Sequence, residues 1–295
     1  MKELGASSWS RRLDAHVELT RRGSESFRAA AQKLGAMDEK SPAMPHLIWL
    51  AAAANNPGAR SKIIALTGHR LPVVRSQAMA ALARFGAVAE TEIVFSQGLK
   101  DTDPQVRLAA LAGLLNQNKE LPFESVVTTA TSTFGDMSSN TNGTYLRQTA
   151  CFLLARRANL KQLTALCEDL DFKRRMTGVL AVGFRLTVPR WDEPLDKSVP
   201  LDAGNGYTVT YANGVKEDLR QRGPMGNFTI ADAWDTGVRS DEDQTLFALL
   251  LHRLDDADEK VARQAAFFLR LLDDPRSERQ ATVATSSIPA GPNVR

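Results

Sequence analysis

The sequence predicts a mainly α fold, an α-solenoid of stacked helix pairs interrupted by a small β-hairpin insertion. Three observations lead to this prediction. An acidic turn followed by an arginine and by helically spaced apolar residues recurs along the chain, and shorter amphipathic segments separate the copies. A stretch rich in Pro, Gly, Asp and Asn breaks the pattern at about residues 187–237. Helix pairs must stack, because one pair alone cannot bury its apolar faces.

The recurring segment is clearest where Asp101–Leu114, DTDPQVRLAALAGL, is set above His69–Leu82, HRLPVVRSQAMAAL. Proline, valine, arginine, alanine and leucine coincide in the two. Asp256–Leu269 repeats the acidic turn, the valine, the alanine and the leucine, although Ala262 replaces the arginine. The spacing of the copies is that of paired-helix repeats. The arginine recurs at Arg12, Arg75, Arg107 and Arg147.

Each copy has the features of a helix start. Asp103 can accept hydrogen bonds from the first-turn amides as an N-cap, and Pro104 suits the first helical position, where its missing N–H costs nothing. Arg107 follows Asp103 by four residues, so we expect the two to pair along the helix surface. The alanine of each copy lies on the apolar line of its helix. We therefore expect Ala110 and Ala150 to be buried at close helix contacts.

Second helices are predicted between the copies, where short links with turn residues, such as NNPG, separate the elements. The repeats are expected over residues 1–186, a final helix pair over 238–275 and a disordered tail over 276–295. The tail lacks apolar periodicity. The expected second helices are Glu25–Leu34, Ala59–Thr67, Ala89–Leu99, Pro122–Thr131 and Lys161–Leu170.

The insertion at 187–237 contains YTVTYANGV, whose alternation predicts a strand and whose Asn213-Gly214 predicts a hairpin turn. Long insertions in a solenoid often form a binding surface. Two interpretations stay open: the hairpin covers an edge of the solenoid, or it binds a partner. The candidate interaction surface consists of Tyr207, Tyr211, Arg220, Arg222 and Trp234.

The Asp-x-Pro turn, followed by Val-Arg and by Ala and Leu at helical spacing, resembles the first helix of HEAT-type repeats. The resemblance covers roughly residues 7–186 and returns at 241–273. It implies an armadillo-type stack of helix pairs. It implies little about function, because one architecture serves many purposes.

A narrower resemblance involves GFRLTVPRWDEPL, YTVTYANGVKEDLRQRGPMGNFTIADAW and the stretch from DEDQTLFALLLHRL to DDPRSE. These segments resemble the repeat section of large, exported bacterial multidomain dehydrogenase/c-type cytochrome (PVC-type haem-binding) proteins. That family combines a propeller, HEAT-like repeats and a cytochrome with CxxCH. The resemblance implies a repeat spacer whose partner is a dehydrogenase or a c-type cytochrome. This sequence has neither propeller nor CxxCH, so no haem or redox role transfers to any residue.

No combination of residues predicts catalysis or a bound cofactor. The four histidines form no HExxH motif and no Cys/His pair at ligand spacing. Cys151 and Cys167 form no CxxC pair, so we expect both to pack in the core. The carboxylates of Leu254–Glu259, LDDADE, lack the glycine and distal glutamate of an EF-hand loop and predict a capped turn. We therefore expect no enzyme activity, metal or cofactor from this chain alone.

Composition limits the classes of partner that the chain is expected to bind. The 295 residues carry a formal net charge of +3, too small an excess to favour nucleic acid or an anionic membrane. No run is long enough to span a membrane, and the start lacks the apolar core of a signal peptide. A complete chain would be expected in the cytoplasm, whereas a fragment of the resembling family would be exported.

The function predicted from these observations is a non-catalytic scaffold or protein-interaction module. The alternative is the spacer of an exported dehydrogenase–cytochrome protein. A remote alternative is a HEAT-like DNA glycosylase, which needs a positive concave face with aromatic residues around a flipped base. Solvated helix faces and pairing between repeats explain the basic residues more simply. The basic clusters are Arg11-Arg12, Arg21-Arg22, Arg156-Arg157 and Lys173-Arg174-Arg175.

Overall fold

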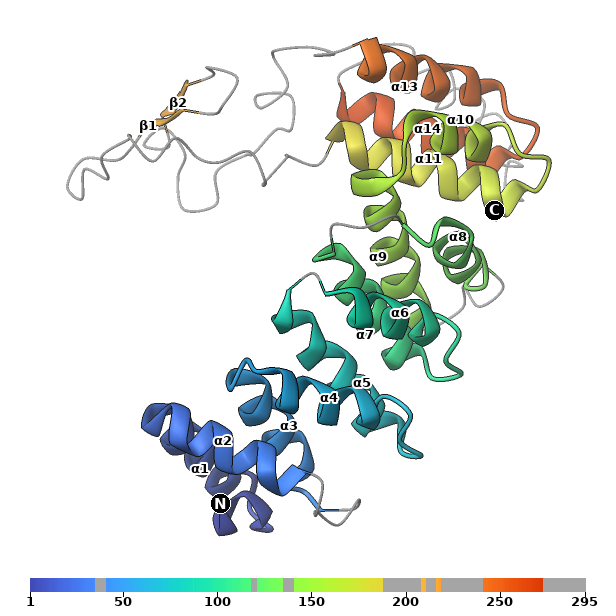
Figure 1. The fold of residues 1–295 in the computed structure, drawn as a ribbon. Coiled ribbons are helices and arrows are strands. Elements are labelled where there is room, and N and C mark those ends of the chain that lie inside the picture. Colours follow the sequence, from blue (N-terminus) through green and yellow to red (C-terminus); the bar gives the residue numbers. More distant parts are fainter. Residues whose placement is uncertain are drawn as a thin grey trace, which may run out of the picture. The chain divides into compact units, whose positions relative to one another are not determined.

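The computed structural model describes residues 1–34, 41–86, 88–117, 121–134, 141–187, 208–210, 216–218 and 241–272. The prediction of a mainly helical chain is confirmed, with helices that follow one another in pairs (Figure 1). The chain divides into two compact units, Met1–Ala181 and Val182–Arg295.

Helix pairs build the first unit, which opens with a short 3-10 turn, η1 (Lys2–Gly5), and has another, η3 (Ala83–Phe85). The first helices of the pairs are α1 (Trp9–Arg22), α3 (Met44–Ala53), α5 (Pro72–Leu82), α7 (Pro104–Leu115), α9 (Thr141–Arg157) and α11 (Phe172–Thr187), which begins in this unit. The second helices are α2 (Ser24–Lys33), α4 (Pro57–Leu66), α6 (Ala89–Gly98), α8 (Phe123–Thr131) and α10 (Leu160–Cys167). The five predicted second helices are confirmed, with ends displaced by a few residues at most.

Contacts between these helices follow a repeating order. First helices pack on first helices, α3 on α5, α5 on α7 and α7 on α9. Four of the second helices also pack on the first helix of the next pair: α2 on α3, α4 on α5, α6 on α7 and α8 on α9. Neighbouring pairs therefore bury one another's apolar faces, which is the packing of a helical repeat.

Small residues let these helices approach closely. Ala110 and Ala150 have no exposed surface, which confirms their predicted burial. Gly113 of α7 has the same role, because a Cβ there would lie 2.3 Å from the ring of Phe95. Phe95 belongs to α6 and is fully buried. The α6–α7 contact thus depends on the missing side chain of Gly113.

The fold ties each of four first helices to the turn before it through an arginine. Nη1 of the arginine donates to the carbonyls five and six residues earlier, over 2.7–3.2 Å. The predicted pairing of Asp103 with Arg107 is therefore wrong. The Asp103 carboxylate caps α7 instead, by accepting from the Gln105 and Val106 amides. The four arginines are Arg12, Arg75, Arg107 and Arg175.

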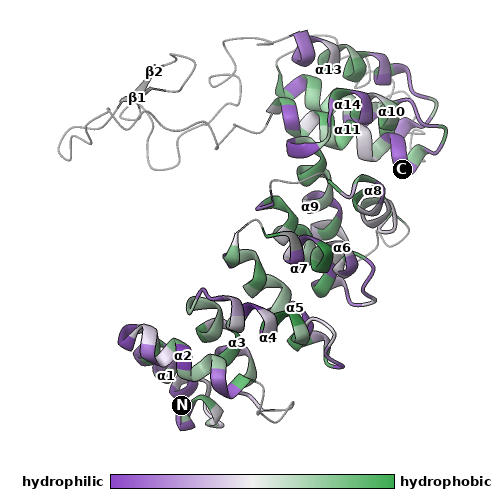
Figure 2. Ribbon diagram, viewed as in Figure 1, coloured by the Kyte–Doolittle hydropathy of each residue, from purple (hydrophilic) through white to green (hydrophobic). Residues whose placement is uncertain are grey.

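The α1 helix differs from the other first helices in polarity, and Figure 2 shows hydrophilic colours along α1 where α3 is mostly hydrophobic. When Arg12 is aligned with Arg107, Glu18 of α1 takes the place of the buried Gly113. His16 likewise takes the place of Leu111. The His16 ring packs against His46 of α3 at 5.2 Å between centroids.

The second unit contains the end of α11, α13 (Asp241–His252), the 3-10 turn η5 (Arg253–Asp255) and α14 (Glu259–Leu271). Gly183 of α11 accommodates the Phe268 ring, which a Cβ would meet at 2.1 Å. Arg185 pairs with Glu242 at 2.6 Å. Asp258 accepts from the Lys260 and Val261 amides. The prediction that LDDADE forms a capped turn between helices is thereby confirmed.

Within the predicted insertion the structure describes only two three-residue strands, β1 (Thr208–Thr210) and β2 (Lys216–Asp218), which pair antiparallel. The Asn213-Gly214 turn and the flanking tyrosines lie outside the described residues. A packed hairpin insertion is therefore not seen, and it stays a prediction, as does the tail at 276–295.

Replacing Gly113 by alanine tests the close approach of α6 and α7. We expect Gly113→Ala to lower the free energy of unfolding by about 1–3 kcal/mol, because the new methyl group overlaps a buried ring. The matched control is Gly58→Ala in the first turn of α4, where a Cβ would meet only the Asn56 side chain at 3.5 Å. Urea unfolding measures both. Equal stability of the two variants would contradict the packing described for Phe95.

Acidification tests the contact between α1 and α3. Burial lowers the pKa of His16 and of His46, and the nearby His16 and Arg12 lower the pKa of His46 further. The unfolded chain therefore takes up these protons first, so stability present above about pH 6.5 is lost as the pH falls through the lowered pKa values. We expect the Tm to fall between pH 7.5 and 5.5, and His16→Leu to reduce that fall. His252→Gln, in the second unit, should leave it unchanged, and an undiminished fall in His16→Leu would refute the assignment.

Candidate functional site

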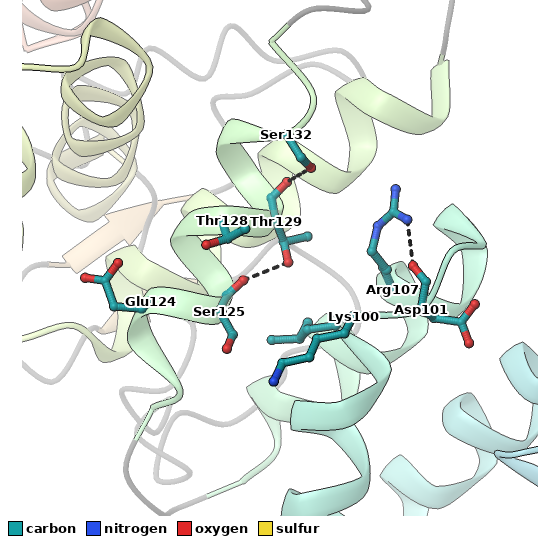
Figure 3. Close-up of a pocket in the computed structure, with 9 residues that line it drawn as sticks. Lys100, Asp101, Arg107, Glu124, Ser125, Thr128, Thr129 and Ser132 are labelled. Atoms are coloured by element: carbon teal, nitrogen blue, oxygen red, sulfur yellow. Dashed lines mark hydrogen bonds between the residues drawn. The ribbon is translucent and has the colours of Figure 1, made fainter.

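A groove of about 450 Å³ opens between neighbouring helix pairs of the first unit (Figure 3). The end of α6 and the turn after it form one side, α7 contributes an arginine, and α8 forms the other side. The residues that line it are Leu99, Lys100, Asp101, Arg107, Glu124, Ser125, Thr128, Thr129 and Ser132. Only the first of these is an apolar residue, so polar and charged residues supply most of the lining side chains.

Hydroxyl side chains form one face of α8. Ser125, Thr128, Thr129 and Ser132 recur at helical spacing, and of these Thr129 is buried. Val126, Val127 and Ala130 are buried as well. The Thr129 hydroxyl donates to the Ser125 carbonyl at 2.8 Å, and the Ser132 hydroxyl donates to the Thr129 carbonyl at 2.9 Å. The hydroxyls of Ser125 and Thr128 have no hydrogen-bond partner within the part of the chain that the structure describes. They are available to a ligand or to water.

Two cationic side chains face these hydroxyls. Lys100 follows α6, is exposed and has no ion-pair partner among the described residues; Figure 3 shows its side chain extending from the α6 end. Arg107 is fixed by the bonds from its Nη1 to the carbonyls of Asp101 and Thr102. Its Nε is buried without a partner. Its Nη2 also has none within the described ranges, so one face of the guanidinium remains unpaired.

The two carboxylates of the groove are already engaged. Asp101 accepts from Nε and Nη2 of Arg75, at 2.7 and 2.8 Å, and from the Asp103 amide. The Arg75 bonds hold the pKa of Asp101 below its ordinary value, and the Asp101 bonds raise the pKa of Arg75. Glu124 accepts both terminal amino groups of Arg174, at 2.9 and 3.2 Å. The pKa of Arg174 is raised, first by Glu124.

Donors therefore outnumber available acceptors in the groove. Each carboxylate forms a two-point contact with an arginine from another helix, a strong charge-assisted arrangement. Lys100, Arg107, Ser125 and Thr128 keep donors that no described residue accepts. An arrangement of this kind suits a ligand that carries oxygen acceptors, and it offers no general base at the surface of the groove.

The candidate surface predicted from the sequence, Tyr207, Tyr211, Arg220, Arg222 and Trp234, lies outside the described residues and stays a prediction. Reasoning from the sequence did not find the groove. A signal for it exists in ESVVTTATS, where hydroxyl residues follow the helical period. Nothing in the sequence pairs Asp101 with Arg75 or Glu124 with Arg174, so the unengaged donors could not be recognised.

Other chemistry-bearing residues have packing roles. Cys151 and Cys167 are both buried, as predicted, and burial raises the pKa of the Cys151 thiol to about 12. Among the described residues no three His, Cys, Asp or Glu side chains gather as metal ligands would. No helix in the described ranges is long and apolar enough to cross a membrane.

The basic clusters are largely engaged within the protein. Arg21 and Arg22 both pair with Glu18, and Arg11 pairs with Glu3. Arg174 bridges Glu124 and Asp169. The guanidinium of Arg156 lies 5.7 Å from the centroid of the Phe152 ring. These contacts are the local pairing by which the sequence analysis explained the basic residues.

Comparisons with known proteins give little further information. No protein-family model and no curated protein matches the chain. A designed armadillo repeat protein in complex with the peptide (KR)4 is 13% identical over 92% of this chain and 97% of that one, with a TM-score of 0.29. An engineered protein is 14% identical over 95% of both chains, with a TM-score of 0.31.

Likenesses at these TM-scores carry no argument about fold, ligand or partner. The helical repeat rests on the packing of this chain's own helices. None of the comparisons supports the resemblance to dehydrogenase–cytochrome proteins.

Substituting Asp101 tests the ion pair beneath the groove. The side chains of Asp101 and Arg75 are each 14% exposed, so Asp101→Asn leaves a poorly solvated guanidinium without its counter-charge. We expect unfolding to become easier by about 1–3 kcal/mol at pH 7. The effect should vanish as the pH falls through the lowered pKa of Asp101, where the wild-type carboxyl is also neutral. The matched control is Glu90→Gln, because the Glu90 side chain is 64% exposed and lies 3.5 Å from Arg60. A control loss as large as that of Asp101→Asn would show that burial of the pair contributes nothing.

Proposed function

We propose that this chain is a non-catalytic protein-interaction scaffold that binds a segment of its partner in the groove beside α8. The observation that carries the proposal is the set of unengaged donors in that groove. These donors line an open groove between the second helices α6 and α8, whereas the first helices pack on one another in the apolar stack. The assignment of the pairs to the HEAT type belongs to the same proposal and rests on the Asp-x-Pro turn, followed by Val-Arg and by Ala and Leu at helical spacing.

The composition of the groove favours a polypeptide over a small molecule. Small-molecule sites are enclosed and lined mostly by apolar and aromatic side chains. This groove has no aromatic side chain and a single apolar one, Leu99. An extended segment that lies across several side chains gains from many weak polar contacts. The spacer of a redox protein, the alternative function, has no comparable observation in its favour.

Site-directed photocrosslinking tests the proposal. A benzophenone amino acid replaces Ser132, an exposed residue of the groove that is not one of the unengaged donors, in the chain expressed in its native host. We expect illumination to join it to a defined protein, which mass spectrometry identifies. The control position is Ala112, exposed on α7 outside the groove lining. Absence of adducts at 132, or the same adducts from both positions, would refute the groove as the contact surface.

A further inference from the structure

We propose that the groove selects an acidic segment of the partner protein, with a Glu or Asp carboxylate held between Lys100 and Arg107 on one side and the α8 hydroxyls on the other. This inference rests on the proposed function and adds the chemistry of the partner. It follows from which groups of the groove are engaged and which are not.

Every charged acceptor of the groove is already used. Both oxygens of Asp101 face the fork of Arg75, and Oδ1 also accepts from the Asp103 amide. Both oxygens of Glu124 accept from Arg174, which Asp169 also anchors through Nε at 2.7 Å. Arg75 and Arg174 therefore balance the negative charge of these two carboxylates. A basic segment would meet two cations, and the carboxylates of the groove are already paired with arginines.

Four donors remain for an incoming carboxylate. Lys100 contributes a mobile ammonium group, and Arg107 contributes a guanidinium that two carbonyl bonds hold in place. Ser125 and Thr128 lie about one helical turn apart on the exposed face of α8, so their hydroxyls offer two donors along one wall. A carboxylate has about four lone-pair sites and can accept from several of these groups at once.

The arrangement favours a carboxylate over a phosphate. A complete arginine fork binds carboxylate and phosphate alike, whereas the amides of a helix N-terminus are a common additional site for phosphate. Nη1 of Arg107 is committed to the Asp101 and Thr102 carbonyls, so its fork favours neither anion. The amides at the start of α7 are capped by Asp103. Single bonds from Lys100 and from hydroxyls match the lower charge of a Glu or Asp side chain.

Fluorescence anisotropy with four labelled probes tests the inference at 150 mM salt. At this ionic strength, attraction between exposed charges that lie farther apart than about 8 Å is largely screened, so direct contacts dominate the binding. The probes are a decapeptide of alternating Glu and Gly, its Gln counterpart, its phosphoserine counterpart and a ten-nucleotide oligothymidylate. We expect the Glu peptide to bind at least about tenfold more tightly than the Gln peptide, a difference of about 1.4 kcal/mol. We also expect it to bind more tightly than the other two probes. Failure to prefer Glu over Gln overturns the inference. If the phosphoserine peptide binds more tightly than the Glu peptide, the groove prefers phosphate. If the oligothymidylate binds more tightly, the groove prefers nucleic acid. Either result also overturns the inference.

Variants locate the binding. Lys100→Gln and Thr128→Val change exposed side chains, and each should weaken binding of the Glu peptide at least about fivefold. Lys161→Gln changes an exposed lysine of α10 by the same charge and should have no effect. An equal loss in this control would show that net charge, and not the groove, attracts the peptide. Photocrosslinking at Ser132 to a partner that lacks acidic segments would leave the proposed function intact and refute only this inference.

Discussion

The bond on which most of this structure depends is the one between an arginine and the turn before its own helix. In α1, α5, α7 and α11 the same nitrogen, Nη1, donates to carbonyls five and six residues earlier. These carbonyls lie at a chain reversal, where no helical amide reaches them. Satisfying them with a charged donor fixes the helix start relative to the turn. The rotation of the helix about its own axis is thereby fixed. This rotation determines which row of apolar residues packs into the stack.

Once the rotation of the first helices is fixed, small residues determine how closely the neighbours approach. Gly113 receives the Phe95 ring in the first unit, and Gly183 receives the Phe268 ring in the second. Each aromatic ring occupies the space that a side chain at the glycine would take, so the contact reaches the packing density of a protein interior. The same turns position the groove. Asp101, whose carbonyl accepts from Arg107, uses its carboxylate to bind Arg75 of the preceding pair. Asp101 therefore contributes to the start of α7, to the contact between neighbouring pairs and to the wall of the groove.

Local features of the sequence could be predicted, and those that depend on distant partners could not. The N-cap at Asp103, the buried Ala110 and the range of each second helix follow from propensity and period. Arg175 was overlooked, although DLDFKRR repeats the spacing of DTDPQVR. The ion pair of Asp101 joins residues 26 apart, and that of Glu124 joins residues 50 apart. The unengaged donors of the groove can be recognised only when these pairs are known. The hairpin insertion stays a prediction, because most of its residues lie outside the described ranges.

Function in such a chain resides in surface chemistry, because the stack itself is shared by proteins of many roles. The central claim is that the partner lies against α8. Hydrogen–deuterium exchange of the chain, alone and bound to the protein recovered by crosslinking, tests this most directly. We predict slower amide exchange on binding in residues 99–107 and 121–134, with no change in α4 of the same unit. Slower exchange confined to other segments, with these two ranges unaltered, would contradict the claim.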